Sequence, residues 1–512
     1  MNEFIAFILP LATALVGMRL NRWILGKKYE DEFGLGFRFA FGLGTGMLVF
    51  SQAVLLSALA GVNAFAFLAR VALLWGAVEV VLHAMKAPAI AKSFKFQPRH
   101  WWLLLLLPLF YSWWVFGRLS TLEGTMEFDA NAFWVFKAKI LYLAQGKALM
   151  DVIHQPNLGY AHMDYPMLVP GLYTLGYGAA GQVDEFINKV WPFWMMVALS
   201  VGILSFARVW RQPRLLPIAA VTLIGFLPAT LQFIRNEGGT IPMVFYTALA
   251  TMLIIRALRG ENALSPAAII LALTGCFCTK FEGVVFSAIC SMALLPFCFQ
   301  RGWLKNKTVW ISAGAAVLCV LPYVFFRMAK PIPHPEDAWL HYGMTTTTAS
   351  GSLLHRFGQI WFLDVFARFF DANFFSWKDV NDHLQFTGHW SGLGNFANEQ
   401  LSILPWLVMA LIVFTLIFKP RERVTVGVFS GIIIVVFSIL SFVIACLRLD
   451  SLTDGINFTI GIVGRYYYPF FVAWFLAIIA LWLPEKGALA PADDPVKTKS
   501  ANPLAPKQKR QP

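Results

Sequence analysis

The stretch VTVGVFSGIIIVVFSILSFVIAC, residues 424–446, contains no charged side chain. A helix of this length, rising about 1.5 Å per residue, crosses a hydrocarbon core about 30 Å thick. Similar apolar stretches recur along all 512 residues, of which 58% are hydrophobic and 13% charged. Soluble domains carry about 25% charged residues. With a mean hydropathy of +0.63, the sequence predicts an all-α integral membrane protein.

We expect about thirteen transmembrane helices, each long enough to cross the bilayer. They are predicted near residues 3–20, 35–60, 63–85, 101–117, 190–207, 216–233, 241–257, 265–280, 283–299, 309–328, 401–418, 424–446 and 467–484.

The net charge of +13 comes from basic residues in short loops and in the tail after residue 485. This distribution follows the positive-inside rule, so it indicates topology and argues against a nucleic-acid partner. The amino terminus is predicted outside and the carboxyl terminus inside. The segment PMLVPGLYTLGYGAAG, residues 166–181, is too short and too interrupted by Pro and Gly for a span, and we expect a re-entrant or interfacial helix.

Two outer loops, 118–189 and 329–400, hold seven of the nine histidines. Long loops on a helical bundle usually carry function. All six cysteines lie in apolar stretches without zinc-site spacing, which favours a packing role. The expected division of the chain is 1–117 (transmembrane), 118–189 (catalytic outer loop), 190–328 (transmembrane), 329–400 (outer loop), 401–484 (transmembrane) and 485–512 (disordered cytoplasmic tail).

The segment EFDANAFWVFKAKIL, residues 127–141, combines acids, aromatic rings and lysine. In a helix, Asp129, Phe133 and Lys137 share one side. The aromatic residues suit a helix in the membrane interface, where a carboxylate could take a proton from a hydroxyl while cations face a lipid phosphate. The alternative is an ordinary amphipathic connector that Asp129 caps.

Three further outer segments carry ionisable residues. The first is YAHMDYPMLVP (160–170), with His162 and Asp164; the others are RNEGGT (235–240) with Glu237 and TKFEG (279–283) with Glu282. The acids of the last two stand beside Arg235 and Lys280 at helix–helix turns. Ionisable groups at membrane depth are often functional. The alternatives are local hydrogen bonds in the loop and exposed ion pairs at the turns.

Three other features of the sequence can be explained by packing or by topology. GRYYYPFF (464–471) places Arg465 among tyrosines at the last span, which suits a phosphate, although a snorkelling arginine in an aromatic belt looks the same. Glu79 and His83, one turn apart, indicate a packed polar pair. Gly42 and Gly46 indicate close helix contact, since no strand precedes them as in a phosphate-binding loop.

Taken in order, the motifs FDxxxFWxxKAK, DYPMLVP, NEGGTIPMVFY, TKFEG and RYYYP resemble those of bacterial membrane glycosyltransferases of the GT-C superfamily. Its members include protein mannosyltransferases and the aminoarabinose transferase that modifies lipid A. The resemblance covers about residues 118–300 and the final span. Here three extra spans precede the acidic loop, which in relatives follows the first span.

The resemblance implies a catalytic site of Asp129, as base, and Glu127. It places Asp164 and Tyr165 on the second motif and Arg465 on the terminal basic position. The acids are separated by a phenylalanine instead of adjacent, which leaves dependence on a divalent cation open. With these residues, the predicted substrate-binding set comprises Lys137, His162, Asp164, Tyr165, Glu237, Glu282 and Arg465.

The implied reaction is inverting transfer of a sugar from a polyprenyl-phosphate donor to a glycan, lipid or protein acceptor, on the outer face of a bacterial inner membrane. Inversion needs one base and no glycosyl-enzyme. The first alternative is an O-antigen ligase or polymerase with a lipid pyrophosphate donor, working through Arg356, Arg368 and His389. The second is a transporter or flippase of lipid-linked sugars, which would place charges within the spans.

Overall fold

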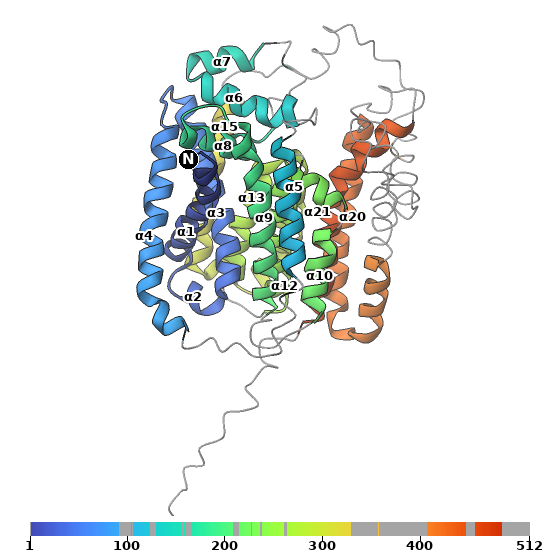
Figure 1. Cartoon of the computed structure of the whole chain (residues 1–512). Helices are drawn as coiled ribbons and strands as arrows, with labels where there is room; N and C mark the ends of the chain where they lie inside the picture. The colour runs from blue at the N-terminus through green and yellow to red at the C-terminus, as the bar shows by residue number, and fades with distance from the viewer. Residues whose placement is uncertain are drawn as a thin grey trace, which may run out of the picture.

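The computed structural model is a bundle of helices (Figure 1) and contains no strand among the residues that it describes. Those residues are 2–91, 104, 106–122, 130–155, 158, 165–207, 215–226, 228–235, 238–260, 264–328, 357, 407–446 and 456–483. The predicted outer loop 329–400, apart from Phe357, and the predicted tail 485–512 lie outside them.

The helices follow the apolar stretches of the sequence. They are α1 (Asn2–Leu25), α2 (Lys28–Glu32), α3 (Leu35–Leu59), α4 (Phe65–Ala91), α5 (Leu106–Leu122), η2 (Ala130–Val135), α6 (Phe136–Leu143), α7 (Lys147–Ile153), α8 (Leu168–Ala180), α9 (Glu185–Phe206), α10 (Leu215–Phe226), α11 (Pro228–Arg235), α12 (Thr240–Leu258), α13 (Ser265–Thr279), α14 (Phe281–Gln300), η4 (Trp303–Lys305), α15 (Lys307–Met328), η6 (Pro420–Glu422), α20 (Arg423–Cys446) and α21 (Ile456–Leu481).

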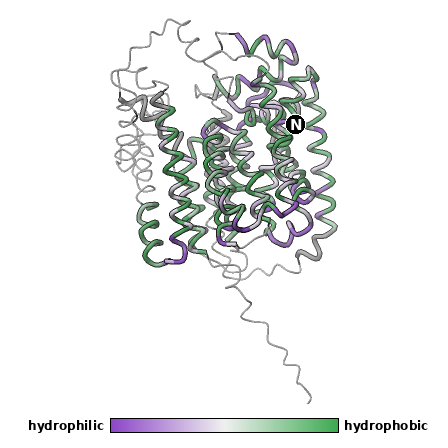
Figure 2. The backbone as a smooth tube through the Cα atoms, turned by 180° about the vertical axis from the view of Figure 1, so that it is seen from behind, coloured by the Kyte–Doolittle hydropathy of each residue, from purple (hydrophilic) through white to green (hydrophobic). Residues whose placement is uncertain are grey.

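Among the residues that the structure describes, eight helices are long and apolar enough to cross a membrane, which confirms the prediction of a multi-pass helical protein. Shorter apolar helices stand at the other predicted positions, so the number thirteen stays a prediction. Figure 2 shows apolar residues along the helices and hydrophilic ones gathered toward the two ends of the bundle. The shorter helices are Leu106–Val115, Leu215–Gly225, Ser265–Thr279, Leu407–Phe418 and Tyr468–Leu481.

One predicted span is divided in the structure. The stretch 216–233 forms α10 and then α11, and α11 begins with Pro228. Proline cannot donate a backbone hydrogen bond and restricts the residue before it, so it starts helices more readily than it continues them.

Helices α1 and α3 are in backbone contact, as the glycines of α3 predict. A Cβ atom added at Gly46 would lie 2.2 Å from the carbonyl oxygen of Thr13, and one added at Gly17 would lie 1.9 Å from that of Gly42. Larger side chains cannot occupy these positions without separating the helices. The amino-terminal helices therefore belong to the core of the bundle.

Helix α12 is buried over its whole length and runs through the centre of the bundle. Its 19 residues extend over about 28 Å, from Gly239 to Arg259. We call the end at Gly239, where Trp134 and Lys280 also lie, the motif end. The end at Arg259, with Arg256 and Arg301, is the basic end. In Figure 1 the motif end faces upward, toward α6 and α7, and α2 lies at the opposite end.

Helix α8 is the stretch expected to be re-entrant, and the structure buries it inside the motif end. A Cβ at Gly171 would lie 2.8 Å from the Ser51 carbonyl, and one at Gly178 would lie 2.5 Å from the backbone of Phe65. Ser51 lies eight residues before Leu59, the last residue of α3, or about 12 Å along the axis. Helix α8 thus begins below the end of α3, at the level of Ser51, and ends beside the start of α4 at Phe65.

Candidate functional site

The ammonium group of Lys137 is the centre of the motif end. Lys137 has no exposed surface. Its Nζ lies 5.2 Å from the ring centroid of Trp134 and 5.3 Å from that of Tyr165. The rings contact each other, with their centroids 6.3 Å apart. The electron-rich faces of aromatic rings attract a cation most strongly where water is excluded, so this lysine keeps its position without solvent.

A second buried lysine approaches the same indole ring. Lys280 Nζ lies 5.9 Å from the centroid of Trp134, and 3.5 Å from Glu282 Oε1. Lys280 is 6% and Glu282 4% exposed. The sequence left open an exposed ion pair at the α13–α14 turn; the pair exists, but it is buried. Such a pair interacts far more strongly than one in water.

Gly239 brings the RNEGGT motif into the same cluster. A Cβ atom at this position would lie 2.9 Å from Trp134 Cζ2 and 3.0 Å from Lys280 Cγ. A glycine is therefore required where Trp134 and Lys280 approach the start of α12. Trp134, Lys137, Tyr165, Lys280 and Glu282, together with Gly239, are called the motif-end cluster below.

The helix predicted from residues 129 to 141 differs from expectation in one way. Its first part, Ala130–Val135, is a π-helix, and the α-helix begins only at Phe136. The wider π-helical turn breaks the four-residue spacing that was to place Phe133 and Lys137 on one side, whereas Asp129 lies outside the described residues. Single π-helical turns occur frequently at functional sites. Trp134 and Lys137 are buried, while Phe133, Phe136 and Lys139 keep partial exposure.

Helix α8 packs against this segment. The hydroxyl of Thr174 donates hydrogen bonds to the carbonyl oxygens of Ala138, at 3.1 Å, and of Pro170, at 2.9 Å. Tyr165 precedes α8 by three residues, so the same short segment delivers the tyrosine to Lys137.

Helix α21 carries Arg465 along α12. Thr247 donates to the Pro469 carbonyl at 3.4 Å, and Arg259 donates to the Ala480 carbonyl at 3.1 Å. Both helices therefore run in the same direction, from the motif end to the basic end. Arg465 is four residues nearer the motif end than Pro469, or about 6 Å along the axis.

Tyr468, from the same motif, is buried against α11. Its hydroxyl is hydrogen-bonded to Thr230, and its ring centroid lies 5.4 Å from that of Phe233. Helix α11 leads into the RNEGGT motif, so the terminal tyrosine motif packs beside the helix that precedes that motif.

The predicted site residues fall into two groups, those that the structure describes and those that lie outside the described part. Within the part of the chain that the structure describes, Lys137, Tyr165 and Glu282 come together. The remaining predicted site residues lie outside it, as does the side chain of Arg465; they are Glu127, Asp129, His162, Asp164 and Glu237. Arg356, Arg368 and His389 of the alternative reading also lie outside. Among the described residues no group of three His, Cys, Asp or Glu side chains could hold a metal ion.

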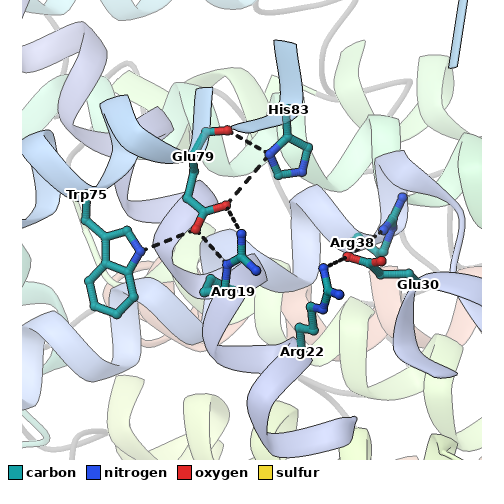
Figure 3. Close-up of polar contacts among 7 residues, drawn as sticks. All are labelled: Arg19, Arg22, Glu30, Arg38, Trp75, Glu79 and His83. Atoms are coloured by element: carbon teal, nitrogen blue, oxygen red, sulfur yellow. Dashed lines mark hydrogen bonds and ion pairs between the residues drawn. The ribbon is translucent and has the colours of Figure 1, made fainter. Parts of the chain in front are cut away.

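Glu79 belongs to a separate polar cluster nearer the basic end (Figure 3). The carboxylate accepts two hydrogen bonds from Arg19, at 2.6 and 2.8 Å, and a longer one from the Trp75 indole at 3.4 Å. His83 Nδ1 lies 2.8 Å from the Glu79 carbonyl and 3.8 Å from Oε2. The predicted polar pair of Glu79 and His83 is therefore confirmed. Arg19, on another helix, is the partner that the local sequence could not reveal.

A neighbouring group joins α1, α2 and α3. Arg22 and Arg38 flank the Glu30 carboxylate at 2.8 and 3.8 Å (Figure 3). The buried phenol of Tyr29 donates to the Arg38 carbonyl at 3.3 Å. Burial raises the pKa of Tyr29, with a smaller opposing effect from its hydrogen bond to Asn21, so the phenol remains a neutral donor. These contacts hold the short helix α2 against the bundle.

The five cysteines whose side chains the structure describes pack as expected from the sequence; the side chain of Cys446 lies outside that part. Cys276, Cys278 and Cys290 are buried, Cys298 and Cys319 are half-buried, and all five are free.

Comparisons with protein-family models, with curated proteins and with solved structures found no match for this chain.

Proposed function

We propose that this chain is a membrane glycosyltransferase that moves a sugar from a polyprenyl-phosphate donor to an envelope acceptor, with inversion. The single observation that supports this most is the motif-end cluster. Four motifs far apart in the sequence contribute to it: Trp134 and Lys137 from the first, Tyr165 from the second, Gly239 from the third and the Lys280–Glu282 pair from the fourth.

Buried ammonium groups suit the leaving group of this reaction. When the bond between the anomeric carbon and the phosphate oxygen breaks, its electron pair remains on the phosphate. A cation fixed in a site without water stabilises that developing charge more than one in solvent. Lys137 is fully buried and packed against two rings, so it needs little rearrangement to meet a phosphate.

The base is assigned to Asp129, with Glu127 beside it in the sequence. The acceptor hydroxyl gives its proton to Asp129 while its oxygen attacks the anomeric carbon from the side opposite the phosphate. One new carbon–oxygen bond replaces one broken bond, and no covalent enzyme intermediate is required. Arg465, His162, Asp164 and Glu237 complete the proposed binding set.

The proposed location is a bacterial inner membrane, with the motif end facing the periplasm. The basic end then faces the cytoplasm, as the positive-inside rule requires. In this orientation a polyprenyl chain would lie in the outer leaflet beside the bundle, with its phosphate at the depth of the motif-end cluster.

Two experiments in sequence test the proposal. Mass spectrometry of envelope glycans from cells with and without the protein identifies the sugar and the acceptor. Purified enzyme in proteoliposomes is then given the corresponding polyprenyl-phosphate sugar. We expect Asp129→Asn to reduce transfer by about 10²- to 10⁴-fold and Lys137→Met to reduce it by a comparable factor, with both proteins remaining folded.

Glu185→Gln is the matched control. Glu185 also carries a lysine partner near the motif end, Lys139, but the two side chains are 32% and 34% exposed, and the variant is expected to retain full transfer. Unchanged transfer by Asp129→Asn would refute the assignment of the base. Activity only with a lipid pyrophosphate donor would favour the ligase or polymerase, and translocation of the intact lipid-linked sugar would favour the flippase.

A further inference from the structure

Glu282 has one carboxylate oxygen that the motif-end cluster leaves unused. Its Oε1 faces Lys280 Nζ at 3.5 Å. Its Oε2 is buried and has no hydrogen-bond partner among the described residues. Leaving a buried acceptor without a donor is unfavourable by about 1–3 kcal/mol or more for a charged group. The natural use of such an oxygen is to accept a hydrogen bond from a bound molecule.

The backbone around Glu282 is tightly fixed. Gly283 follows it, and a Cβ there would lie 1.9 Å from the Cys276 carbonyl oxygen, so α13 and α14 are in direct contact. Glu282 also occupies the first turn of α14, where the helix dipole favours a negative charge. The carboxylate is therefore held in place independently of any ligand.

The groups around Lys280 match a sugar ring. A sugar presents hydroxyl donors at its edge and carbon–hydrogen bonds on its face, and binding sites for such molecules combine a few fixed polar groups with apolar or aromatic surface. Glu282 supplies a charged acceptor. Trp134, which Lys280 contacts through its ring, supplies the aromatic surface. The backbone of Gly239 packs against the edge of that ring, where a Cβ atom would lie 2.9 Å from Trp134 Cζ2.

The charges also give the donor a direction. A carboxylate repels a phosphate, so the phosphate cannot lie at Glu282, whose own lysine is already 3.5 Å away. Lys137 lies on the Trp134 and Tyr165 rings and is the cation assigned above to the phosphate. The sugar then extends from Lys137 toward Glu282.

We propose that Glu282 is a specificity-determining residue that accepts a hydrogen bond from one ring hydroxyl of the donor sugar. This inference rests on the proposed function, because it takes the donor to be a polyprenyl-phosphate sugar. Lys280 is a positioning residue: it holds the first oxygen of Glu282 and thereby directs the second toward the sugar.

The test measures donor binding, which needs no acceptor. Equilibrium binding of polyprenyl-phosphate hexose, or of the pentose if mass spectrometry identifies one, is compared with that of its monodeoxy analogues, each lacking one hydroxyl. In the wild-type protein, one analogue should bind about 10- to 100-fold more weakly, the usual effect of a hydrogen bond to a charged group. Glu282→Gln should weaken the parent donor and remove most of the discrimination against that analogue.

The controls distinguish a failure of this inference from a failure of the proposed function. Glu185→Gln should keep the wild-type pattern. Glu282→Asp, which shortens the side chain while keeping its charge, provides a second variant if Glu282→Gln is poorly folded, and it should also lose discrimination. If Glu282→Gln weakens all analogues by one common factor, or none, Glu282 is only structural and the inference fails while the function stands. If wild-type protein binds no polyprenyl-phosphate sugar, the proposed function fails and the inference with it.

Discussion

Replacing Arg259 by alanine would test how the basic end holds α12 and α21 together. Arg259 Nε and Nη2 donate to Glu422 Oε1 at 2.9 and 2.7 Å. Its guanidinium also donates to carbonyl groups at the end of α21 and just beyond it. Nη1 donates to those of Ala480 and Leu483, at 3.1 and 3.2 Å, and Nη2 to that of Leu481, at 2.6 Å. One side chain at the end of α12 thus caps α21 and pairs with η6.

The expected effect is large because both charges are buried. The side chains of Arg259 and Glu422 are 8% and 9% exposed. Removing one partner of a buried ion pair costs about 3–5 kcal/mol, mainly because the other charge stays buried without it. Lys419 still donates to the Leu481 carbonyl at 3.0 Å, so one end of α21 keeps part of its capping. About 1.4 kcal/mol corresponds to a tenfold change in rate. The rate of inactivation should therefore rise by a factor of about 10² to 10⁴ if the contact is lost before the rate-limiting step.

Membrane proteins commonly unfold irreversibly, so the half-life of monodisperse protein in detergent at a fixed temperature is the appropriate measurement. The control is Arg423→Ala. Arg423 directly follows Glu422 in the sequence and donates to the Leu416 carbonyl at 2.9 Å in an exposed position. It should change stability by less than about 1 kcal/mol. The double variant Arg259→Met, Glu422→Leu removes both charges and should recover much of the loss. Equal half-lives for Arg259→Ala and Arg423→Ala would refute the reasoning.

Two further substitutions probe the other clusters. Glu79→Leu leaves Arg19 without the carboxylate that accepts two of its hydrogen bonds. Because the Arg19 side chain keeps 19% exposure, we expect a loss of stability of about 2–4 kcal/mol, slightly below that of a fully buried pair. The same half-life assay measures it, and an unchanged half-life would contradict the expectation. Gly239→Ala places a methyl group 2.9 Å from Trp134 and 3.0 Å from Lys280. We expect overpacking to lower the stability of the protein by about 1–3 kcal/mol and sugar transfer to fall by at least about tenfold. Normal transfer would show that these contacts do not position the site.

The sequence predicted some tertiary contacts because they depend on local spacing. Gly42 and Gly46, four residues apart, present one small-residue face of a helix, and that face meets α1. Glu79 and His83 are also four apart, so they meet within one helix. Neither prediction required knowledge of which distant segment lies nearby.

The candidate site could be predicted only as a set of motifs on one side of the membrane. Each motif contains polar residues that ordinary loops also contain. The π-helix at Ala130–Val135 was missed because no propensity rule marks one, and the burial of Lys137 was missed because a lysine beside aromatic residues usually lies at a surface. The role of Gly239 depends on Trp134 and Lys280, which belong to other segments.

By itself, then, the sequence determined the helices, their apolar lengths and the end of the bundle at which each turn lies. Those properties follow from summed hydropathy and from charge in short loops, which are local quantities. Only the tertiary structure decided that Lys137 is enclosed by Trp134 and Tyr165, and that Arg19 and Arg259 have buried carboxylate partners on other segments. Such pairings depend on how helices far apart in the chain pack against one another, and the strength of each interaction depends on the water that this packing excludes.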